Sequence, residues 1–460
     1  PTSRCSSAAS DVYKRQGLGP RGMSAAIRSA NPDILVGIPK ALAAARTLRW
    51  PGRRISTVPL SAATGRALGV ETDLETLRNR PGVIPERAVG GDLAAMAFTS
   101  GATGPSKGVL YSRDRLAAQR DAIADLYDID RDDRLVAAFA PFALYGPLLG
   151  IPSVVPDMDV AAPGTLTAPA LGDAADRVDA TLVFASPAAL SNVVETADRL
   201  SPSHVAAFDR VRLLLSAGAP VSPALLRDVA TLFPNATVAT PYGMTECLPV
   251  ASITLREIEA ATDGDGVCVG VPLPTVDVRV RPLVGGDLTT EPGVVGEIVV
   301  RAPHARLGYD RLWHTEHLAS TPRGWHATGD VGHLDGSGRL WVGGRIGHVI
   351  TTADGPVTPV RPEQKVESLD GVGAAAVVGV GPAGVQQIVV VTQPSDAPRS
   401  ARLADLRLHD RVRAVVDGPV AAVLEVPAIP VDRRHNSKVD RARLAEWAER
   451  TLSGARMTDP

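Results

Sequence analysis

One short segment of the chain combines small residues, hydroxyl groups and a lysine in the manner of an anion-binding loop. Residues 98–109 read FTSGATGPSKGV, with three glycines and one lysine. Small residues let backbone N–H groups converge on an anion, hydroxyls donate further hydrogen bonds, and lysine supplies charge. The spacing is not that of a Walker A loop, because Gly101, Gly104 and Lys107 are three apart and a glycine follows the lysine. The segment predicts a phosphate loop of another kind, although such a loop alone is more often a turn.

Three later segments carry further residues suited to nucleotide chemistry. They are TPYGMTE (240–246), HATGDVGHLDGSGRLWVGGR (326–345) and RRHNSKVDR (433–441). Each has a structural explanation too, since Asp330 could cap a turn, Glu246 could be a solvated charge and Lys438 could begin an exposed helix. The composition favours a specific role for the lysines. The chain has five lysines against 43 arginines, and two of the five, Lys107 and Lys438, lie in these segments and the glycine-rich loop.

The elements that must position these segments alternate between strands and helices. A buried strand at 93–98 enters the glycine-rich loop, and a short strand at 109–111 leaves it. Ser112 is then expected to cap a helix that runs to about Leu126. Further strand-like runs occupy 181–185, 209–220 and 236–243. This alternation predicts an α/β sheet whose sites lie at the carboxyl ends of its strands.

After residue 270 the sequence becomes rich in strand patterns with glycine turns, and the last section ends in a helix near Leu452. We therefore predict an α/β fold with two domains. Residues 17–344 are expected to form a large N-terminal domain of αβ-layered sheets with a β-rich subdomain, and residues 345–460 a small α+β domain. Residues 1–16 lack signal-peptide architecture and apolar periodicity, so we expect a non-native or disordered tail.

The composition limits the classes of partner and the cellular compartment that we expect. The net charge of −2 arises from 48 basic and 50 acidic residues, so nothing favours nucleic acid or an anionic membrane as a partner. Three cysteines without metal-like or redox-like spacing suit a reducing cytosol, and we expect a cytoplasmic protein. Residues 135–156 carry no charge, but four prolines interrupt them. This favours buried strands and loops, including a pocket wall, over a membrane span.

In this order and at these separations, the four segments resemble the adenylate-forming superfamily of acyl-CoA synthetases, luciferases and peptide-synthetase adenylation domains. The resemblance covers about residues 30 to 452 and implies that the small C-terminal domain is a mobile lid. Members bring a carboxylate to the α-phosphorus of ATP and expel pyrophosphate, so catalysis rests on positioning and charge neutralisation. Relatives carry more chain before the phosphate loop than the 97 residues that precede Phe98, and we expect this sequence to be truncated at its start.

The resemblance implies that ATP and Mg²⁺ bind, and it assigns residues to ATP. The loop residues that would hold the β- and γ-phosphates are Thr99, Ser100, Gly101, Thr103, Gly104 and Lys107. The residues that would line the adenine pocket are Ser216, Ala217, Gly218, Tyr242 and Gly243. Asp330 would accept both ribose hydroxyls with its two oxygens, and Arg345 would support the ribose.

The same resemblance implies three residues at the reacting phosphate. Thr245 would touch the α-phosphate. Glu246 would ligate Mg²⁺, a hard cation that commonly takes one carboxylate together with phosphate oxygens. Lys438, delivered by the small domain, would bridge the substrate carboxylate and the α-phosphate as the adenylation lysine.

Two features separate this sequence from members that transfer the acyl group to CoA. Gly347 stands where those members have a hinge aspartate or lysine, and Ser437 replaces the glycine before the adenylation lysine. The segments at 139–159, 240–250, 338–345 and 431–448 closely resemble the β-lactone synthetases of long-chain olefin and β-lactone biosynthesis. Those enzymes adenylate a 2-alkyl-3-hydroxyalkanoate and let its own hydroxyl expel AMP, so proximity replaces CoA.

This narrower resemblance implies a hydrophobic β-hydroxy acid substrate and partner enzymes of the olefin or β-lactone pathway. His435 is a candidate for the base that deprotonates the hydroxyl, because it lies close to Lys438 in the sequence. Two alternatives stay open. One is a long-chain acyl-CoA or acyl-ACP ligase of the same superfamily, and the other is an inactive fragment that binds nucleotide.

Overall fold

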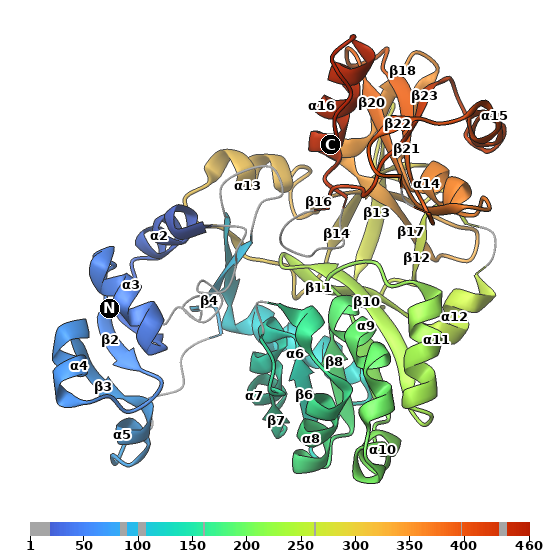
Figure 1. Ribbon diagram of the computed structural model, residues 1–460. Helices are drawn as coiled ribbons and strands as arrows, with labels where there is room; N and C mark the ends of the chain where they lie inside the picture. Colours follow the sequence, from blue (N-terminus) through green and yellow to red (C-terminus); the bar gives the residue numbers. More distant parts are fainter. Residues whose placement is uncertain are drawn as a thin grey trace.

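The largest sheet of the computed structural model has six strands, is mostly parallel and lies in the lower half of Figure 1. The structure describes residues 19–82, 90–99, 107–159, 162–261, 264–396, 398–431 and 439–460. In spatial order the strands are β11 (Cys247–Thr254), β10 (Thr237–Met244), β9 (Leu213–Ser216), β8 (Leu182–Ala185), β6 (Leu135–Ala138) and β7 (Ser153–Val154). All neighbours pair in parallel except β11, which is antiparallel to β10. β6, β8 and β9 are buried along their length, which explains their continuous apolar sequences.

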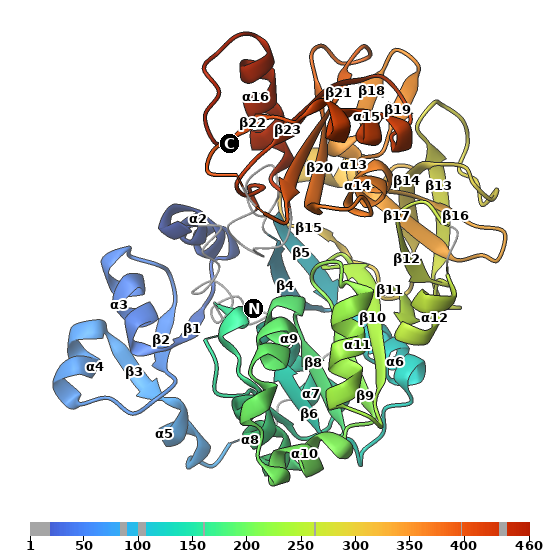
Figure 2. The same cartoon turned by 45° about the vertical axis from the view of Figure 1, so that its right-hand side comes forward.

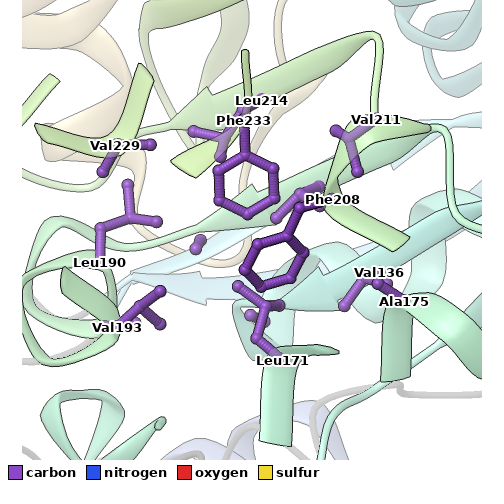
Figure 3. Close-up of a cluster of buried hydrophobic side chains, with 14 of the residues drawn as sticks. Val136, Leu171, Ala175, Leu190, Val193, Phe208, Val211, Leu214, Val229 and Phe233 are labelled. Atoms are coloured by element: carbon purple, nitrogen blue, oxygen red, sulfur yellow. The ribbon is translucent and has the colours of Figure 1, made fainter. Parts of the chain in front are cut away.

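Helices cover both faces of this sheet. One face packs against α8 (Ala168–Val178), α9 (Pro187–Glu195), α10 (Pro202–Asp209) and α11 (Pro223–Leu232). Val136 and Leu214 point to this face, where the rings of Phe208 and Phe233 stack with centroids 4.2 Å apart (Figure 3). Alternate residues such as Phe184 point to the opposite face, because side chains alternate along a strand. That face packs against the end of α6 (Arg113–Tyr127), η1 (Ala140–Leu144) and α7 (Tyr145–Leu149).

A five-stranded antiparallel sheet packs beside the parallel one. Its order is β12 (Val267–Gly270), β17 (Leu340–Arg345), β16 (His326–Leu334), β14 (Gly296–Arg301) and β13 (Asp277–Pro282). Val250 of β11, Ile298 of β14 and Leu340 of β17 lie in the core that joins the two sheets. This sheet is the strand-rich section expected after residue 270.

Two smaller sheets are formed mainly by the N-terminal third of the chain. A hairpin of β4 (Leu93–Thr99) and β5 (Lys107–Ser112) is extended by β15 (Gly308–Tyr309). A parallel sheet contains β1 (Ile34–Gly37), β2 (Arg53–Ser56) and β3 (Val70–Asp73), with α2 (Gly19–Ala30), α3 (Pro39–Thr47), α4 (Ala62–Leu68) and α5 (Leu74–Arg78) around it. Ile27 of α2 and Trp50 share a core with Met96 and Phe98 of β4, so β4 connects this unit to the rest.

The C-terminal part has its own sheet and core. The strand order is β20 (Val372–Val380), β21 (Gln387–Pro394), β23 (Val420–Glu425) and β22 (Arg402–Leu403). α14 (Val360–Glu367) and α15 (Leu406–Val415) pack on one face, and α16 (Arg441–Leu452) packs on the other. Figures 1 and 2 place this part above the antiparallel sheet. The remaining elements are η2 (Pro163–Thr165), η3 (Ala197–Arg199), α12 (Leu255–Ala260), α13 (Trp313–Ala319), η4 (Ile346–His348), β18 (Ile350–Thr352) and β19 (Gly355–Val357).

The predicted α/β fold is confirmed, and each predicted strand overlaps an observed one. The predicted cap by Ser112 is wrong in its mechanism. α6 begins directly after Ser112, but the Ser112 side chain makes no capping hydrogen bond and is buried. The first N–H groups of the helix are satisfied by other backbone groups instead, since Arg113 and Asp114 donate to carbonyl oxygens of Asp92 and Gly90 at 3.0 and 2.9 Å.

The uncharged segment 135–156 contains more helix than the sequence suggested. It includes β6 and β7, as expected, but the proline-rich stretch between them forms the helical turns η1 and α7. A proline in the first turn of a helix loses no intrahelical hydrogen bond, so these prolines are compatible with short turns. In the part of the chain that the structure describes, no helix is both long enough and apolar enough to cross a membrane.

Candidate functional site

The carboxyl ends of three strands of the parallel sheet supply one side of the candidate site. β6 ends just before Phe139, β9 ends at Ser216, and β10 ends one residue before Thr245. Parallel strands present their carboxyl ends at the same edge of a sheet, so the turns after these strands converge. Two of the segments predicted to contact ATP therefore lie at one edge of the sheet.

Three residues predicted to bind the adenosine part of ATP form one hydrogen-bonded group. The Tyr242 hydroxyl donates to Oδ2 of Asp330 at 2.8 Å, and Nε of Arg345 lies 2.9 Å from Oδ1 of the same carboxylate. Asp330 and Arg345 face each other across β16 and β17, whereas Tyr242 comes from β10. Burial and the nearby Asp330 charge raise the pKa of Tyr242, so its phenol stays protonated and remains a donor. The group ties the two large sheets together.

The backbone around Asp330 is also held. Its N–H donates to Oγ1 of Thr328 at 3.0 Å, and the Thr328 hydroxyl donates to the Ile298 carbonyl at 2.8 Å. Both carboxylate oxygens that the resemblance assigns to the ribose already have protein donors. Ribose hydroxyls would therefore have to share these oxygens with Tyr242 and Arg345, or displace them.

The turns after β9 and within β10 need small residues. Ala217 follows Ser216, and Gly218 has a φ of +101°, a left-handed conformation that favours glycine. A Cβ on Gly218 would lie 3.6 Å from Cζ of Phe139, and a Cβ on Gly243 would lie 2.8 Å from the Cys247 carbonyl oxygen, which is too close.

The Ser216 hydroxyl is buried and has no hydrogen-bond partner among the described residues. Water or a bound polar molecule satisfies such a group.

Two predicted phosphate-binding residues bracket the glycine-rich loop. Thr99 and Lys107 are paired across the β4–β5 hairpin, so they stand opposite each other where the loop leaves and re-enters the sheet. Nζ of Lys107 lies 5.5 Å from the centroid of the Tyr309 ring. The other predicted loop residues, Ser100, Gly101, Thr103 and Gly104, lie outside the described residues.

The turn that carries Thr245 and Glu246 has three partners that the sequence did not point to. The Tyr309 hydroxyl donates to Oε1 of Glu246 at 2.8 Å, and the Arg306 N–H donates to the Glu246 carbonyl at 2.7 Å. The Tyr111 hydroxyl donates to the Thr245 carbonyl. A tyrosine in a buried strand pattern is usually a core residue, so the sequence did not indicate that either tyrosine belongs to the site.

The two residues predicted on the C-terminal segment, His435 and Lys438, lie outside the described residues. The structure does describe both ends of their segment. Val431 and Val439 form an antiparallel bridge, and the Asp440 N–H donates to the Pro430 carbonyl at 2.8 Å. These contacts hold the two ends of the segment together.

An aromatic cluster adjoins the site. Phe142 stacks on Phe184 with ring centroids 3.6 Å apart and on Tyr145 at 4.6 Å, and Phe139 lies 5.7 Å from Phe142. Phe139 also lies beside Gly218, as its distance from a Cβ there shows. The aromatic cluster, Phe139, Phe142, Tyr145 and Phe184, therefore places apolar surface next to the predicted adenine turn.

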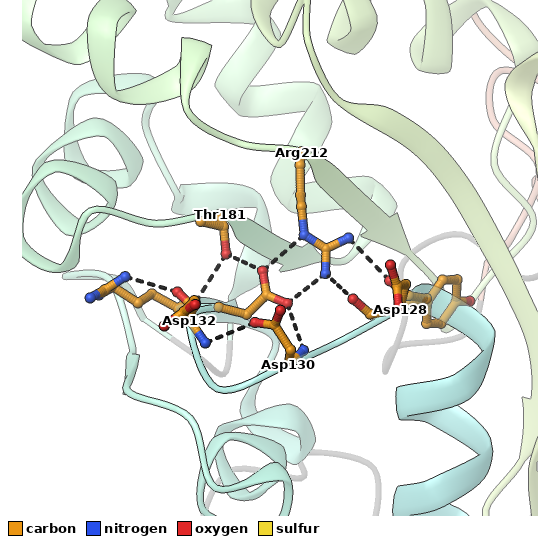
Figure 4. Close-up of polar contacts among 8 residues, drawn as sticks. Asp128, Asp130, Asp132, Thr181 and Arg212 are labelled. Atoms are coloured by element: carbon orange, nitrogen blue, oxygen red, sulfur yellow. Dashed lines mark hydrogen bonds and ion pairs between the residues drawn. The ribbon is translucent and has the colours of Figure 1, made fainter.

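A polar network lies at the other end of the parallel sheet. Asp133 accepts hydrogen bonds from Nε of Arg212 at 2.9 Å and from the Thr181 hydroxyl at 2.6 Å (Figure 4). Burial alone would raise the pKa of Asp133, but these hydrogen bonds outweigh it and lower the pKa. The three residues precede β6, β9 and β8, at the amino ends of the strands, so we interpret the network as structural.

Comparison with known proteins gives a family and two similar relatives. The family model described as "AMP-binding enzyme" matches residues 9–310. The olefin beta-lactone synthetase of Stenotrophomonas maltophilia is 35% identical, over 95% of this chain and 81% of that protein. The olefin beta-lactone synthetase of Xanthomonas campestris pv. campestris is 34% identical, over 94% of this chain and 80% of that protein.

A solved structure supports the same grouping. The amide bond synthetase McbA from Marinactinospora thermotolerans superposes with a TM-score of 0.73 at 26% identity, covering 95% of this chain and 84% of that one. The likeness therefore extends across both the parallel sheet and the C-terminal part.

Proposed function

The chain belongs to the AMP-binding enzyme family and is an ATP-dependent adenylate-forming ligase, and from this premise we propose that it converts a 2-alkyl-3-hydroxyalkanoic acid into a β-lactone. AMP and pyrophosphate are the other products. The observation that carries the proposal is the 34–35% identity to two olefin beta-lactone synthetases, which extends over 94–95% of the chain.

The first step is adenylation of the acid. A carboxylate oxygen forms a bond to the α-phosphorus of ATP, and the bond from that phosphorus to pyrophosphate breaks. Lys107 and the glycine-rich loop would hold the departing pyrophosphate, while Lys438 would lie between the carboxylate and the α-phosphate. Because the step brings two anions together, positioned cations lower its barrier.

The residues at the turn after β10 fit a divalent cation bound together with ATP. Glu246 offers a half-buried carboxylate, and among the described residues its Oε2 accepts no hydrogen bond while Oε1 is held by Tyr309. A single carboxylate combined with phosphate oxygens is the donor set that Mg²⁺ commonly takes. When bound, Mg²⁺ supplies charge neutralisation at the phosphate oxygens.

The second step closes the ring within the substrate. The 3-hydroxyl oxygen bonds to the carbonyl carbon, the bond from that carbon to the AMP oxygen breaks, and the hydroxyl proton passes to a base. We assign the base to His435, on the basis of its position close to Lys438 in the chain. An intramolecular nucleophile gains its advantage from proximity, so no CoA is required.

The aromatic cluster supports a substrate with alkyl chains. Phe139 lies beside Gly218, and Phe142, Tyr145 and Phe184 continue the apolar surface away from it. An acid activated at the carboxyl ends of the strands could lay its alkyl groups on this surface and remove them from water.

The test is a product assay without CoA. Purified protein is incubated with ATP, MgCl₂ and a racemic 2-alkyl-3-hydroxyalkanoic acid, and the products are followed by chromatography and mass spectrometry. We expect AMP, pyrophosphate and the β-lactone in equal amounts.

Two other results would redirect the assignment. A product that forms with CoA present, and not without it, would indicate an acyl-CoA ligase. Failure to release pyrophosphate with any carboxylic acid tested, by a protein that is folded, would indicate a nucleotide-binding protein without this activity.

A further inference from the structure

The Thr245–Glu246 turn is held at three points by one neighbouring structure, the β4–β5 hairpin with β15. Tyr111 of β5 donates its hydroxyl to the Thr245 carbonyl. Arg306, just before β15, donates its N–H to the Glu246 carbonyl at 2.7 Å, and Tyr309 of β15 donates its hydroxyl to Oε1 of Glu246 at 2.8 Å. Two backbone groups and one carboxylate oxygen are thus bound from the same side.

Tyr309 is itself rigidly placed. Its backbone pairs with Val109 of β5, and its N–H donates to Oε2 of Glu316 at 2.8 Å. The guanidinium of Arg306 lies 4.1 Å from the centroid of its ring, and Arg306 is in turn paired with Glu316. The phenol has little freedom to turn away from Glu246, so its hydrogen bond needs no rearrangement.

The hydrogen bond has a defined direction. A phenol hydroxyl carries a hydrogen and an ionised carboxylate only accepts, so Tyr309 donates to Oε1 of Glu246. Only one oxygen of the carboxylate is used by the described residues, which leaves the other available as a ligand. A hydrogen-bonded partner of this kind fixes the orientation of a ligating carboxylate.

The same hairpin begins at the glycine-rich loop. β5 starts at Lys107, immediately after the loop, and Tyr309 pairs with the residue two positions further on, Val109. The Lys107 ammonium lies 5.5 Å from the Tyr309 ring centroid. A displacement of the hairpin would therefore move Lys107, Tyr309 and Tyr111 together.

We propose that Tyr309 is the positioning residue that orients Glu246 toward a divalent cation bound with ATP, and that Tyr111 holds the backbone of the same turn. The two tyrosines couple the geometry of the cation ligand to the strand that leaves the glycine-rich loop. This inference rests on the proposed function in one respect, namely that a cation accompanies ATP at Glu246.

The experiment titrates MgCl₂ against the protein with ATP present and follows the melting temperature. Tyr309→Phe removes the hydroxyl and keeps the ring. The matched control is Tyr127→Phe, which removes another, partly buried tyrosine hydroxyl, one that lies 2.9 Å from Oγ of Ser252. We expect the Mg²⁺ concentration for half-maximal stabilisation to rise about 10- to 100-fold in Tyr309→Phe, the usual effect of removing such a partner. Tyr127→Phe should match the parental protein.

Two further readouts separate positioning from general damage. Pyrophosphate exchange at saturating Mg²⁺ should return to within about threefold of the parental rate in Tyr309→Phe, because excess cation compensates for weaker binding. In a Glu246→Gln background, Tyr309→Phe should add no further change, since a residue that acts through Glu246 has nothing left to orient.

Each outcome decides between the proposals. If the parental protein shows no Mg²⁺-dependent stabilisation with ATP, the proposed cation site itself is wrong. If the parental protein responds and Tyr309→Phe responds at the same Mg²⁺ concentration, the role of Tyr309 is wrong. If Tyr309→Phe is not folded, Tyr111→Phe replaces it, and an unchanged Mg²⁺ requirement in that variant overturns the coupling.

Discussion

At the scale of single residues, Asp330 combines observed contacts within the protein with a predicted role in binding ATP. It accepts hydrogen bonds from Tyr242 and Arg345, and it is the residue assigned to the ribose. Asp330→Asn keeps the shape and removes the charge. We expect the KM for ATP in pyrophosphate exchange to rise roughly 10- to 100-fold, because hydrogen bonds to a charged group contribute about 1.5–3 kcal/mol.

The control for this prediction is another aspartate near the end of the same strand. Asp335 accepts hydrogen bonds from Nε of Arg339 at 2.7 Å and from Nε1 of Trp341 at 2.9 Å, in the turn between β16 and β17. Asp335→Asn should lower the melting temperature and leave the KM for ATP unchanged. Equal KM changes in both variants would mean that Asp330 acts on the fold and not on ATP.

A second prediction at this scale concerns the folding stability at low pH. His326 is buried and accepts a hydrogen bond from Nε of Arg306 at 3.3 Å, and burial together with the Arg306 charge lowers its pKa from 6.5 to about 3. The folded protein keeps this histidine neutral, while the unfolded chain binds a proton below pH 6.5. The contribution of His326 to folding stability is therefore complete above pH 6.5 and is lost as the pH falls toward 3, by about 1.4 kcal/mol per pH unit within that window.

Urea unfolding at about pH 7.5 and about pH 5.5 measures this loss. His326→Asn should reduce the difference in unfolding free energy between the two pH values. His317→Asn, at an exposed position on α13, should leave the difference as it is in the parental protein. An unchanged difference in His326→Asn would show that other groups cause the acid sensitivity.

At the scale of elements, one buried ion pair joins α14 and α16 in the C-terminal part. Nη2 of Arg441 lies 2.6 Å from Oε2 of Glu363, whose other oxygen accepts the Val377 N–H at 2.8 Å. Arg441→Leu leaves the Glu363 charge buried without its cation. We expect a loss of about 3–5 kcal/mol in unfolding free energy, and a substantial recovery in the double variant Glu363→Leu/Arg441→Leu.

A second arginine of the same part gives the comparison. Nε of Arg361 lies 2.8 Å from Oδ1 of Asp265, but both side chains are about half exposed. Arg361→Leu should change the unfolding free energy by about 0–1 kcal/mol, as is usual for exposed pairs. Urea titration of both variants measures the contrast, and similar losses would contradict the role of burial.

At the scale of the whole molecule, the C-terminal part meets the antiparallel sheet through polar contacts. Beside the Arg361–Asp265 pair, Nε2 of Gln364 donates to the Gly266 carbonyl at 3.3 Å. Polar contacts of this kind are compatible with movement of one domain against another. The adenylation lysine assigned by resemblance, Lys438, belongs to this C-terminal part, so the reaction depends on how the part is placed.

Lys438→Ala tests that dependence. The variant should lose at least about 100-fold in pyrophosphate exchange, as when a group that stabilises developing charge is removed. Its melting temperature and its stabilisation by ATP should stay close to the parental values, because the predicted adenosine and phosphate residues are unchanged. Adenylation at the parental rate would refute the assignment of Lys438.

Much of the architecture was predictable from local patterns. The apolar runs at 181–185 and 209–220 correspond to β8 and β9, because strands buried on both faces need continuous apolar residues. The helical turns at 140–149 were not predicted, since the prolines there are equally compatible with loops and with short helices. The cap of α6 was misjudged because carbonyl groups brought from Gly90 and Asp92 satisfy its first N–H groups.

By itself, the sequence determined the α/β class and the strand ends that carry the polar segments. These follow from period, turn residues and spacing, which act over short distances along the chain. The tertiary structure alone decided which side chains meet. Tyr309 reaches Glu246 across 63 positions, and Tyr111 reaches Thr245 across 134. Such pairs depend on how separate sheets pack against one another, and a local sequence pattern does not indicate that packing.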